Sequence, residues 1–326
     1  MMIERSQLEE LYNNELKDKL QGLEGLRKKV RNGQIFGILL LLLTVILFVP
    51  VSAALEHSSE ALPFIVLAPV AIFGIVILIR TYKKRINYRD RFKNEVVREI
   101  VKAIDPTWDY DPNQCITSSE YRSSDLFRKS VDRYKGDDLI RGKIDKTDFR
   151  CSELHTEYKT VTTDKDGKRK ETWHTIFKGL FFHADFNKEI KAKTYIEPDT
   201  AERLLGKFGQ SFQRSSKGKL VKLENPEFEK IFAVYTTDQT EARYILTPTI
   251  MEALVNIYKM YKRKMYLSFI GSRVYVAITF RKNLFEPKIF SSGVQFKDVE
   301  FMYNLFMVNQ TIVHELNLNT RIWTKE

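Results

Sequence analysis

Two long stretches without a charged side chain constrain this chain more than any other feature. The first runs for 21 residues from Ile35 to Leu55, and the second runs for 18 residues from Leu62 to Ile79. A helix rises 1.5 Å per residue, so about 20 apolar residues cross a hydrocarbon core roughly 30 Å thick. The sequence therefore predicts a transmembrane helical hairpin over residues 34–82, closed by the short connection EHSSEA.

The first stretch has an alternative interpretation as a cleaved secretory signal, because VPVSA resembles a cleavage region. Its apolar part is too long for a signal and the segment before it is too acidic, which favours the membrane helix. Pro50 and Pro69 lie inside the two stretches. Membrane helices tolerate proline where neighbouring groups satisfy the freed carbonyls, so neither proline argues against a span.

Basic residues flank the two stretches unevenly, and this asymmetry predicts an orientation. Lys and Arg resist translocation far more strongly than Asp and Glu do. The connection carries Glu56 and Glu60 and neither Lys nor Arg. The sequence thus predicts a multi-pass protein of the bacterial cytoplasmic (inner) membrane with both termini cytoplasmic. The basic flanking residues are Arg27, Lys28, Lys29, Arg31, Arg80, Lys83, Lys84, Arg85, Arg89 and Arg91.

The net charge of +11 could suggest a nucleic-acid partner. A good share of it lies beside the predicted spans, where the anionic headgroups of the lipid bilayer are the nearer partner. Nucleic-acid binding is therefore disfavoured. An alternative in which these charges only set topology and solubility stays open. The candidate anionic-lipid contacts are Arg80, Lys83, Lys84 and Arg85.

Apolar periodicity divides the rest of the chain. Residues 1–33 form a predicted amphipathic cytoplasmic helix, and residues 83–106 form a juxtamembrane stalk helix that Pro106 stops. Residues 107–326 alternate in short runs, which predicts a cytoplasmic α+β domain with a mixed or antiparallel sheet. The apolar stripe of the first helix can pack on the chain itself or pair with a second subunit. Its members are Leu8, Tyr12, Leu16, Leu20, Leu23, Leu26 and Val30.

Turn and capping signals place the elements of the α+β domain. Asp166-Gly167 predicts a hairpin between β-branched and aromatic runs, and Gly271-Ser272 predicts a second one over residues 265–280. Further strands are predicted over 192–197, 220–224 and 228–238. Helices are predicted over 123–130, 199–208, from Thr237 or Asp238, over 248–264 with Thr247 as N-cap, and over 298–316. Ser124 or Asp125 would cap the first of them.

The stretch IFKGLFFHADF, residues 176–186, is too short to cross a membrane and follows a hairpin turn. It is predicted to be a central core strand, with Lys178 at a rim or at a bulge beside Gly179. Alternate side chains should share one face: Ile176, Leu180, Phe182, Ala184 and Phe186.

Catalytic and metal-binding patterns do not emerge. His183 beside Asp185 comes nearest to an acid–base pair, but such a pair on a half-buried strand is more often structural. Cys115 and Cys151 lack the spacing of a zinc or redox site. No phosphate-loop, dinucleotide or serine-hydrolase motif occurs, so no catalytic residue, cofactor or metal is predicted and an enzyme is disfavoured. The remaining histidines stand alone: His57, His155, His174 and His314.

Three segments lie in order after the two apolar stretches: IFKGLFFHADFNK, FEKIFAVYTTDQTEARYILTP and MYLSFIGSRVYVAI. The arrangement resembles an uncharacterised bacterial membrane family catalogued as domain of unknown function 3137, over most of residues 1–326. The resemblance implies an inner-membrane protein with a cytoplasmic domain and supplies no reaction. It also implies a LemA-like membrane protein as a partner, because members of the family are often encoded beside one.

These observations favour a membrane-anchored scaffold or binding module at the cytoplasmic face, with homo-oligomer formation left open. The alternative is a membrane-bound sensor or enzyme for a phosphorylated or lipidic ligand. That ligand would contact two basic loops, Asp164–Lys170 and Arg214–Lys222.

Overall fold

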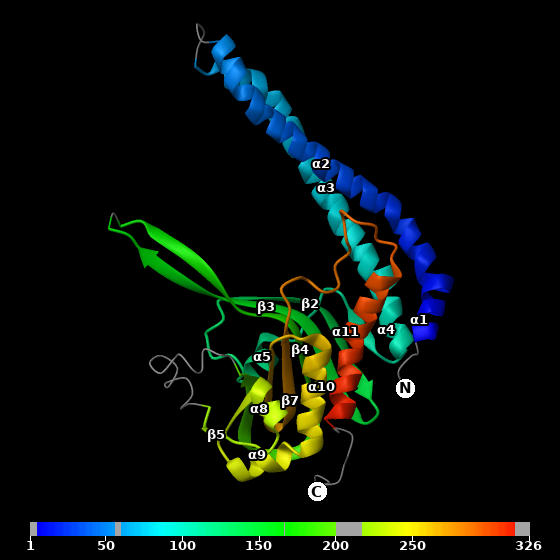
Figure 1. The fold of residues 1–326 in the computed structure, drawn as a ribbon. Coiled ribbons are helices and arrows are strands. Elements are labelled where there is room, and N and C mark those ends of the chain that lie inside the picture. The colour runs from blue at the N-terminus through cyan, green and yellow to red at the C-terminus, as the bar shows by residue number, and fades with distance from the viewer. Residues whose placement is uncertain (1–4, 56–59, 166, 200–216, 317–326) are drawn as a thin grey trace. The chain divides into compact units, whose positions relative to one another are not determined.

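The structure is a computed structural model that describes residues 5–55, 60–165, 167–199 and 217–316, without the side chains of 186–188 and 315. The predicted helix 199–208, most of the loop Arg214–Lys222 and the facing of Phe186 lie outside this description. The chain forms two compact units (Figure 1). The helical unit comprises Met1–Ile104 and Phe285–Tyr303, and the sheet unit comprises Asp105–Leu284 and Asn304–Glu326. The predicted division at 33, 82 and 106 stays a prediction.

The helical unit is built on two long antiparallel helices (Figure 1). Regular helix with one π-helical turn runs over 50 residues from Arg5 to Ala54, and again over 43 residues from Leu62 to Ile104. The helical hairpin is therefore present, and the predicted flanking helices continue it without a break. Its parts are α1 (Arg5–Leu11), η1 (Tyr12–Leu16), α2 (Lys17–Ala54), α3 (Leu62–Phe92), η2 (Lys93–Val97) and α4 (Arg98–Ile104).

Small residues let α2 and α3 approach closely. Gly33 and Gly37 lie one turn apart in a G-x-x-x-G spacing, which is typical of packed membrane helices. A Cβ atom on Gly33 would collide with Thr81, and one on Gly37 would lie 2.6 Å from a methyl of Leu78. The lower part of the hairpin instead packs through larger side chains. Its buried members include Leu8, Leu16, Leu20, Leu23, Val30, Tyr88, Phe92, Val96, Val97 and Ile100.

The sheet unit holds an antiparallel sheet in the order β1-β2-β3-β4-β6-β5, with β7 also paired to β4. Every pairing among the described strands is antiparallel, so the α+β prediction is confirmed with an antiparallel sheet. The strands are β1 (Asp109–Asp111), β2 (Arg133–Ile144), β3 (Thr147–Thr163), β4 (Arg169–Pro198), β5 (Lys219–Val221), β6 (Phe232–Thr236) and β7 (Met265–Thr279). The helices are α5 (Ser118–Ser123), α8 (Pro226–Ile231), α9 (Gln239–Ile245), α10 (Pro248–Tyr261) and α11 (Phe296–Glu315), which begins in the helical unit.

The stretch IFKGLFFHADF lies in the middle of β4, as predicted, and is buried on both faces. Phe177 and Phe181 pack against Tyr121 of α5 and Tyr275 of β7. On the opposite face the ring of Phe182 stacks on Phe149 with the centroids 5.9 Å apart. The predicted bulge occurs at Ile176, where the register with β3 shifts, and not beside Gly179.

The predicted second hairpin is wrong, because residues 265–279 form the single strand β7. Both halves of β7 pair with β4, from Gly179 opposite Thr279 to Ile196 opposite Leu267. Gly271 has φ +60° and lies opposite Ile190, where the register shifts. The glycine therefore allows a kink in one strand, because a positive φ costs glycine little.

Helix boundaries follow local capping chemistry. Asp238 caps α9, and Thr247 caps α10 with Pro248 at its first position, as predicted. The helix predicted over 123–130 is wrong: α5 ends at Ser123 and begins with a capping box between Thr117 and Glu120. The strand predicted over 228–238 is partly wrong, since Asn225 caps the short helix α8 before β6 begins.

Candidate functional site

The upper part of the helix pair presents apolar side chains outward. Only 6% of the most apolar 18 residues of the first helix are buried, and 17% of those of the second. Val45, in the middle of the first stretch, is 70% exposed, and Ile72 on α3 is 59% exposed. By length and composition both helices are able to cross a membrane. A core helix of a soluble domain would instead bury such a surface.

A basic cluster follows the apolar part of α3. The candidate lipid contacts Arg80, Lys83, Lys84 and Arg85 are all exposed, within about two turns of Ile79. Tyr82 between them is also exposed. An aromatic side chain among Lys and Arg at the end of an apolar stretch is the composition found at membrane–water interfaces.

Below this cluster, an irregular segment of the helical unit, residues 285–295, is fastened onto α2 and α3; we call it the clasp loop. The guanidinium of Arg27, which is 3% exposed, donates to the carbonyl of Ile289 at 2.6 Å. The same guanidinium donates twice to the Glu24 carboxylate, at 2.6 and 2.7 Å. The hydroxyl of Tyr88 donates to the carbonyl of Lys288 at 3.2 Å.

Electrostatics around the clasp loop follow from these contacts. The hydrogen bonds from Arg27 lower the pKa of the Glu24 carboxyl, so this group stays ionised. Burial raises the pKa of Tyr88 to about 12, so its hydroxyl stays protonated and able to donate. A second ion pair joins the Nζ atom of buried Lys93 to Glu286 at 3.4 Å. The helix pair thus holds the clasp loop through a buried cation at each of two points.

The sheet unit contains a different polar cluster around His183. This side chain is 2% exposed, and its Nδ1 atom accepts a hydrogen bond from Arg273 Nη1 at 3.0 Å. Its Nε2 atom lies 3.5 Å from Glu120 Oε1 without a hydrogen bond between them, and that oxygen accepts from Arg150 Nη1 at 2.7 Å. Sequence spacing had singled out Asp185 as the neighbour and missed Glu120 and Arg273. Burial and then the Arg273 charge lower the pKa of His183 to about 4.

The lowered pKa predicts an acid-sensitive sheet unit. His183 binds a proton near pH 6.5 when unfolded but near pH 4 when folded, so the unfolded state gains protons first as the pH falls. The contribution of neutral His183 to the free energy of unfolding is fully present above pH 6.5. It should be lost as the pH falls toward 4, which lowers the free energy of unfolding by about 3 kcal/mol. Thermal unfolding followed by tryptophan fluorescence should show this decline in the natural protein and lose most of it in His183→Gln.

The matched control is His174→Gln, which removes a half-buried histidine from the same strand. Its acid profile should follow that of the natural protein. An unchanged decline between pH 6.5 and pH 4 in His183→Gln would contradict the assignment.

Three carboxylates in the described part of the chain come within 4.8 Å of one another: Asp137, Asp138 and Glu153. Chain donors already hold the two buried ones. The Tyr110 hydroxyl donates to Asp138 at 2.5 Å, and the backbone N–H of Leu284 donates to Glu153 at 2.8 Å. Hydrogen bonds of this kind stabilise buried carboxylates without a cation, so the cluster does not by itself define a metal centre.

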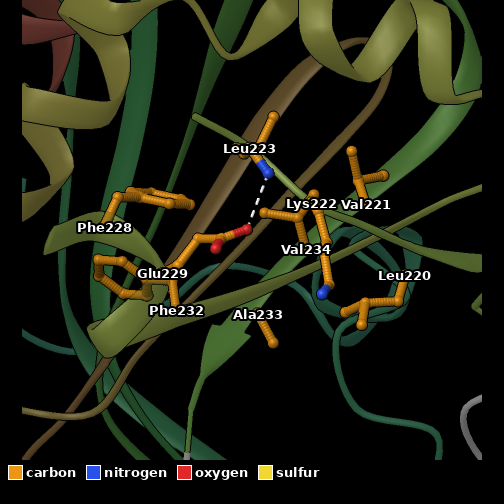
Figure 2. A pocket seen from close by; sticks show the side chains of 9 residues that line it. All are labelled: Leu220, Val221, Lys222, Leu223, Phe228, Glu229, Phe232, Ala233 and Val234. Atoms are coloured by element: carbon orange, nitrogen blue, oxygen red, sulfur yellow. Dashed lines mark hydrogen bonds between the residues drawn. The ribbon is translucent and has the colours of Figure 1, made fainter. Parts of the chain in front are cut away.

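Two cavities of the sheet unit differ in size and depth. One of about 70 Å³ lies between β5, α8 and β6, where Figure 2 shows Glu229 accepting a hydrogen bond from the Leu223 backbone at 2.8 Å. A wider depression of about 500 Å³ next to α9 is open to solvent. Ligand pockets usually enclose 300–1,000 Å³ and bury most of the ligand, so neither resembles a small-molecule site.

The two loops predicted to contact a ligand offer little support for a ligand site. The turn at Asp164–Lys170 lies at the tip of the β3–β4 hairpin, where Lys168 N–H donates to the Asp164 carboxylate at 2.8 Å. Of the loop Arg214–Lys222, the first described residue is Lys217, which is buried and donates to Glu197 and to the carbonyl of Leu126. Its ammonium therefore serves the sheet unit itself.

The two free cysteines are Cys115 and Cys151. Burial raises the pKa of both thiols, which keeps them protonated. A protonated thiol is a weak nucleophile and a poor metal ligand.

These features define an α+β protein with two long, exposed apolar helices and an antiparallel sheet unit. Residues 175–318 match the model of a family described as "Protein of unknown function (DUF3137)", which confirms the resemblance over that segment of the sheet unit and clasp loop. No curated protein matches the chain. A solved structure, that of the mycobacterial trehalose monomycolate transport factor A, TtfA, is 10% identical. The comparison covers 66% of this chain and 91% of that one with a TM-score of 0.32.

Proposed function

We propose that this protein is a membrane-anchored scaffold or binding module of the bacterial cytoplasmic membrane. The observation that carries the proposal is the exposed apolar surface of the helix pair, with 6% and 17% of its two most apolar segments buried. Water would disfavour such a surface, at about 25 cal/mol per Å² of apolar area. A bilayer accommodates it, and helices satisfy their backbone groups internally as a bilayer requires.

Basic residues support an orientation with both termini in the cytoplasm. Arg80, Lys83, Lys84 and Arg85 are exposed at the end of α3, beside the position expected for anionic headgroups. The described part of the connection between the helices contains Glu60 and no basic residue. In this orientation the protein is multi-pass, and the sheet unit stands on the cytoplasmic side.

A binding role fits the sheet unit better than catalysis does. The His183 Nδ1 atom and the Lys217 ammonium, two buried polar groups of this unit, are bonded to other residues of the unit. Of its two cavities given above, one is too small for a ligand and the other is open to solvent. These observations favour the scaffold over a sensor or enzyme for a phosphorylated or lipidic ligand. The partner we propose is a second membrane protein of LemA-like type, or a second copy of this chain.

Crosslinking in native membranes tests the proposal. A photoreactive residue at Lys165, in the tip of the β3–β4 hairpin, and another at exposed Met260 on α10 should each be tried in the full-length protein. We expect a discrete crosslinked species from at least one position, identified by mass spectrometry as a membrane protein or a self-dimer. Recovery of neither species from either position would contradict a scaffold.

A further inference from the structure

The clasp loop carries one strongly exposed phenylalanine, Phe290. Phe290 is 67% exposed, and Ser291 and Ser292 after it are exposed as well. The carbonyls of Lys288 and Ile289 point inward to Tyr88 and Arg27. Phe290 is the residue that follows these two bonded carbonyls, and it is left exposed.

The backbone of this loop is firmly held. Arg27 is buried, and removing a buried charged donor from its acceptors is costly, so the bond to Ile289 restrains the loop. After Phe290 in the loop, the Gly293 backbone also donates to the Glu24 carboxylate. Gly293 in turn lies against the Tyr88 hydroxyl. The backbone is therefore bonded to the helix pair on both sides of Phe290.

The attachment points lie close to the end of the apolar surface. Tyr88 follows Ile79 by nine residues and Arg27 precedes Ile35 by eight, which corresponds to about 12–14 Å along each helix. Headgroups occupy roughly 5–8 Å beyond the hydrocarbon core on each side. The attachment points therefore lie about 4–9 Å from the headgroup layer, a gap comparable to the length of a phenylalanine side chain.

Positive charge on α3 near the clasp loop is complementary to an anionic surface. The charged residues of the clasp loop itself are paired, Lys288 with Asp298 at 2.5 Å and Glu286 with Lys93 at 3.4 Å, so the positive charge available to a surface comes from α3. Exposed Lys83, Lys84 and Arg85 are carried by α3 between the apolar stretch and Tyr88. Positive charge near a membrane attracts anionic lipid, and an exposed aromatic ring is stabilised at the interface.

We propose that the clasp loop is an additional membrane contact, in which Phe290 enters the headgroup layer of an anionic bilayer beside the helix pair. This inference rests on the proposed membrane anchoring. It adds a membrane contact made by a segment more than 200 residues after the second apolar stretch. The hydrogen bond between Tyr88 and Lys288, 200 positions apart, attaches this segment to α3. A membrane is favoured over a protein partner because the clasp loop is attached to the same unit within about 12–14 Å of the exposed apolar stretches, next to the basic cluster of α3.

Depth-resolved fluorescence tests the inference in the full-length protein in nanodiscs that contain phosphatidylglycerol. Single cysteines at Phe290, Val45 and Glu10 would carry an environment-sensitive dye, with Cys115 replaced by serine and buried Cys151 left in place. Val45 marks the apolar stretch, and exposed Glu10 marks a part of the helix about 37 Å from Ile35. Lipids with a nitroxide on the headgroup or deep in the acyl chain serve as quenchers.

We expect the headgroup nitroxide to lower emission from Phe290 roughly twofold, the deep nitroxide to quench Val45, and neither to quench Glu10. Phe290 behaving like Glu10 while Val45 is quenched would overturn the membrane contact and leave the anchoring intact. Absence of quenching at Val45 would instead overturn the proposed anchoring. Replacing phosphatidylglycerol with neutral lipid should reduce quenching at Phe290 and leave Val45 unchanged, and the opposite pattern would also contradict the inference.

Discussion

The double substitution Val45→Arg and Ile72→Arg is expected to remove the protein from the carbonate-resistant membrane fraction. Both side chains are exposed near the middle of the two apolar stretches, at 70% and 59%. An arginine at the centre of a membrane helix costs about 2.5–3.5 kcal/mol, so the pair should disfavour insertion by about 5–7 kcal/mol. We expect the variant in the carbonate-soluble or aggregated fraction, detected by immunoblotting.

A matched control places arginine at an exposed apolar position of the sheet unit. Val161→Arg changes β3, where the side chain is exposed, and should leave the protein in the membrane pellet. Retention of the Val45→Arg and Ile72→Arg variant in that pellet, at the level of the control, would mean that the apolar helices do not insert.

Arg27→Met is expected to release the clasp loop. The substitution keeps much of the side-chain length but removes the hydrogen bonds that Arg27 donates to the Glu24 carboxylate and to the Ile289 carbonyl. Removing one partner of this partly buried ion pair leaves the Glu24 charge uncompensated and destabilises the attachment of the loop. Hydrogen exchange of the protein in nanodiscs should therefore become much faster for amides of residues 286–295, while α2 and α3 stay protected.

Two comparisons isolate the buried pair. Lys28→Met removes the exposed neighbouring charge and should not alter exchange in the clasp loop. The double variant Glu24→Met and Arg27→Met should recover part of the protection, because it removes the carboxylate that the single variant leaves uncompensated. Equal exchange in Arg27→Met and the natural protein would show that Arg27 does not hold the loop.

The helix pair could be predicted from sequence because length and absence of charge determine it almost alone. The stretches that begin at Ile35 and Leu62 are apolar throughout. In an apolar environment a single segment satisfies all of its backbone groups only as a helix. The caps at Asp238 and Thr247 were predictable for a similar reason, since each acts on backbone N–H groups two or three residues away. The same logic would have found α5, whose Thr117 and Glu120 form a capping box.

Pairing over long distances could not be predicted in this way. The Gly271-Ser272 dipeptide has the composition of a hairpin turn, yet the strand on each side of it finds β4 as its partner. Whether β7 folds back or continues depends on a strand about 80 residues earlier. A local pattern cannot encode that choice, because alternation of side chains is the same in either arrangement.

The polar contacts of the candidate sites also escape sequence spacing. Arg27 counted only as one of the basic residues before the first apolar stretch, although it bonds a carbonyl 262 positions away. His183 appeared to belong with Asp185, two residues on, whereas its hydrogen bond comes from Arg273, 90 positions away. Burial gives such contacts their importance, and burial follows from the tertiary fold.

Cysteine accessibility in intact bacterial cells tests the central claim, a membrane anchor with the sheet unit in the cytoplasm, most directly. With Cys115 replaced by serine, single cysteines at Glu60, in the connection between the helices, and at Lys165, in the β3–β4 turn, would be exposed to a membrane-impermeant maleimide. With this orientation we expect labelling at Glu60 in intact cells and at Lys165 only after permeabilisation. Labelling at Lys165 in intact cells, or none at Glu60 before permeabilisation, would contradict it.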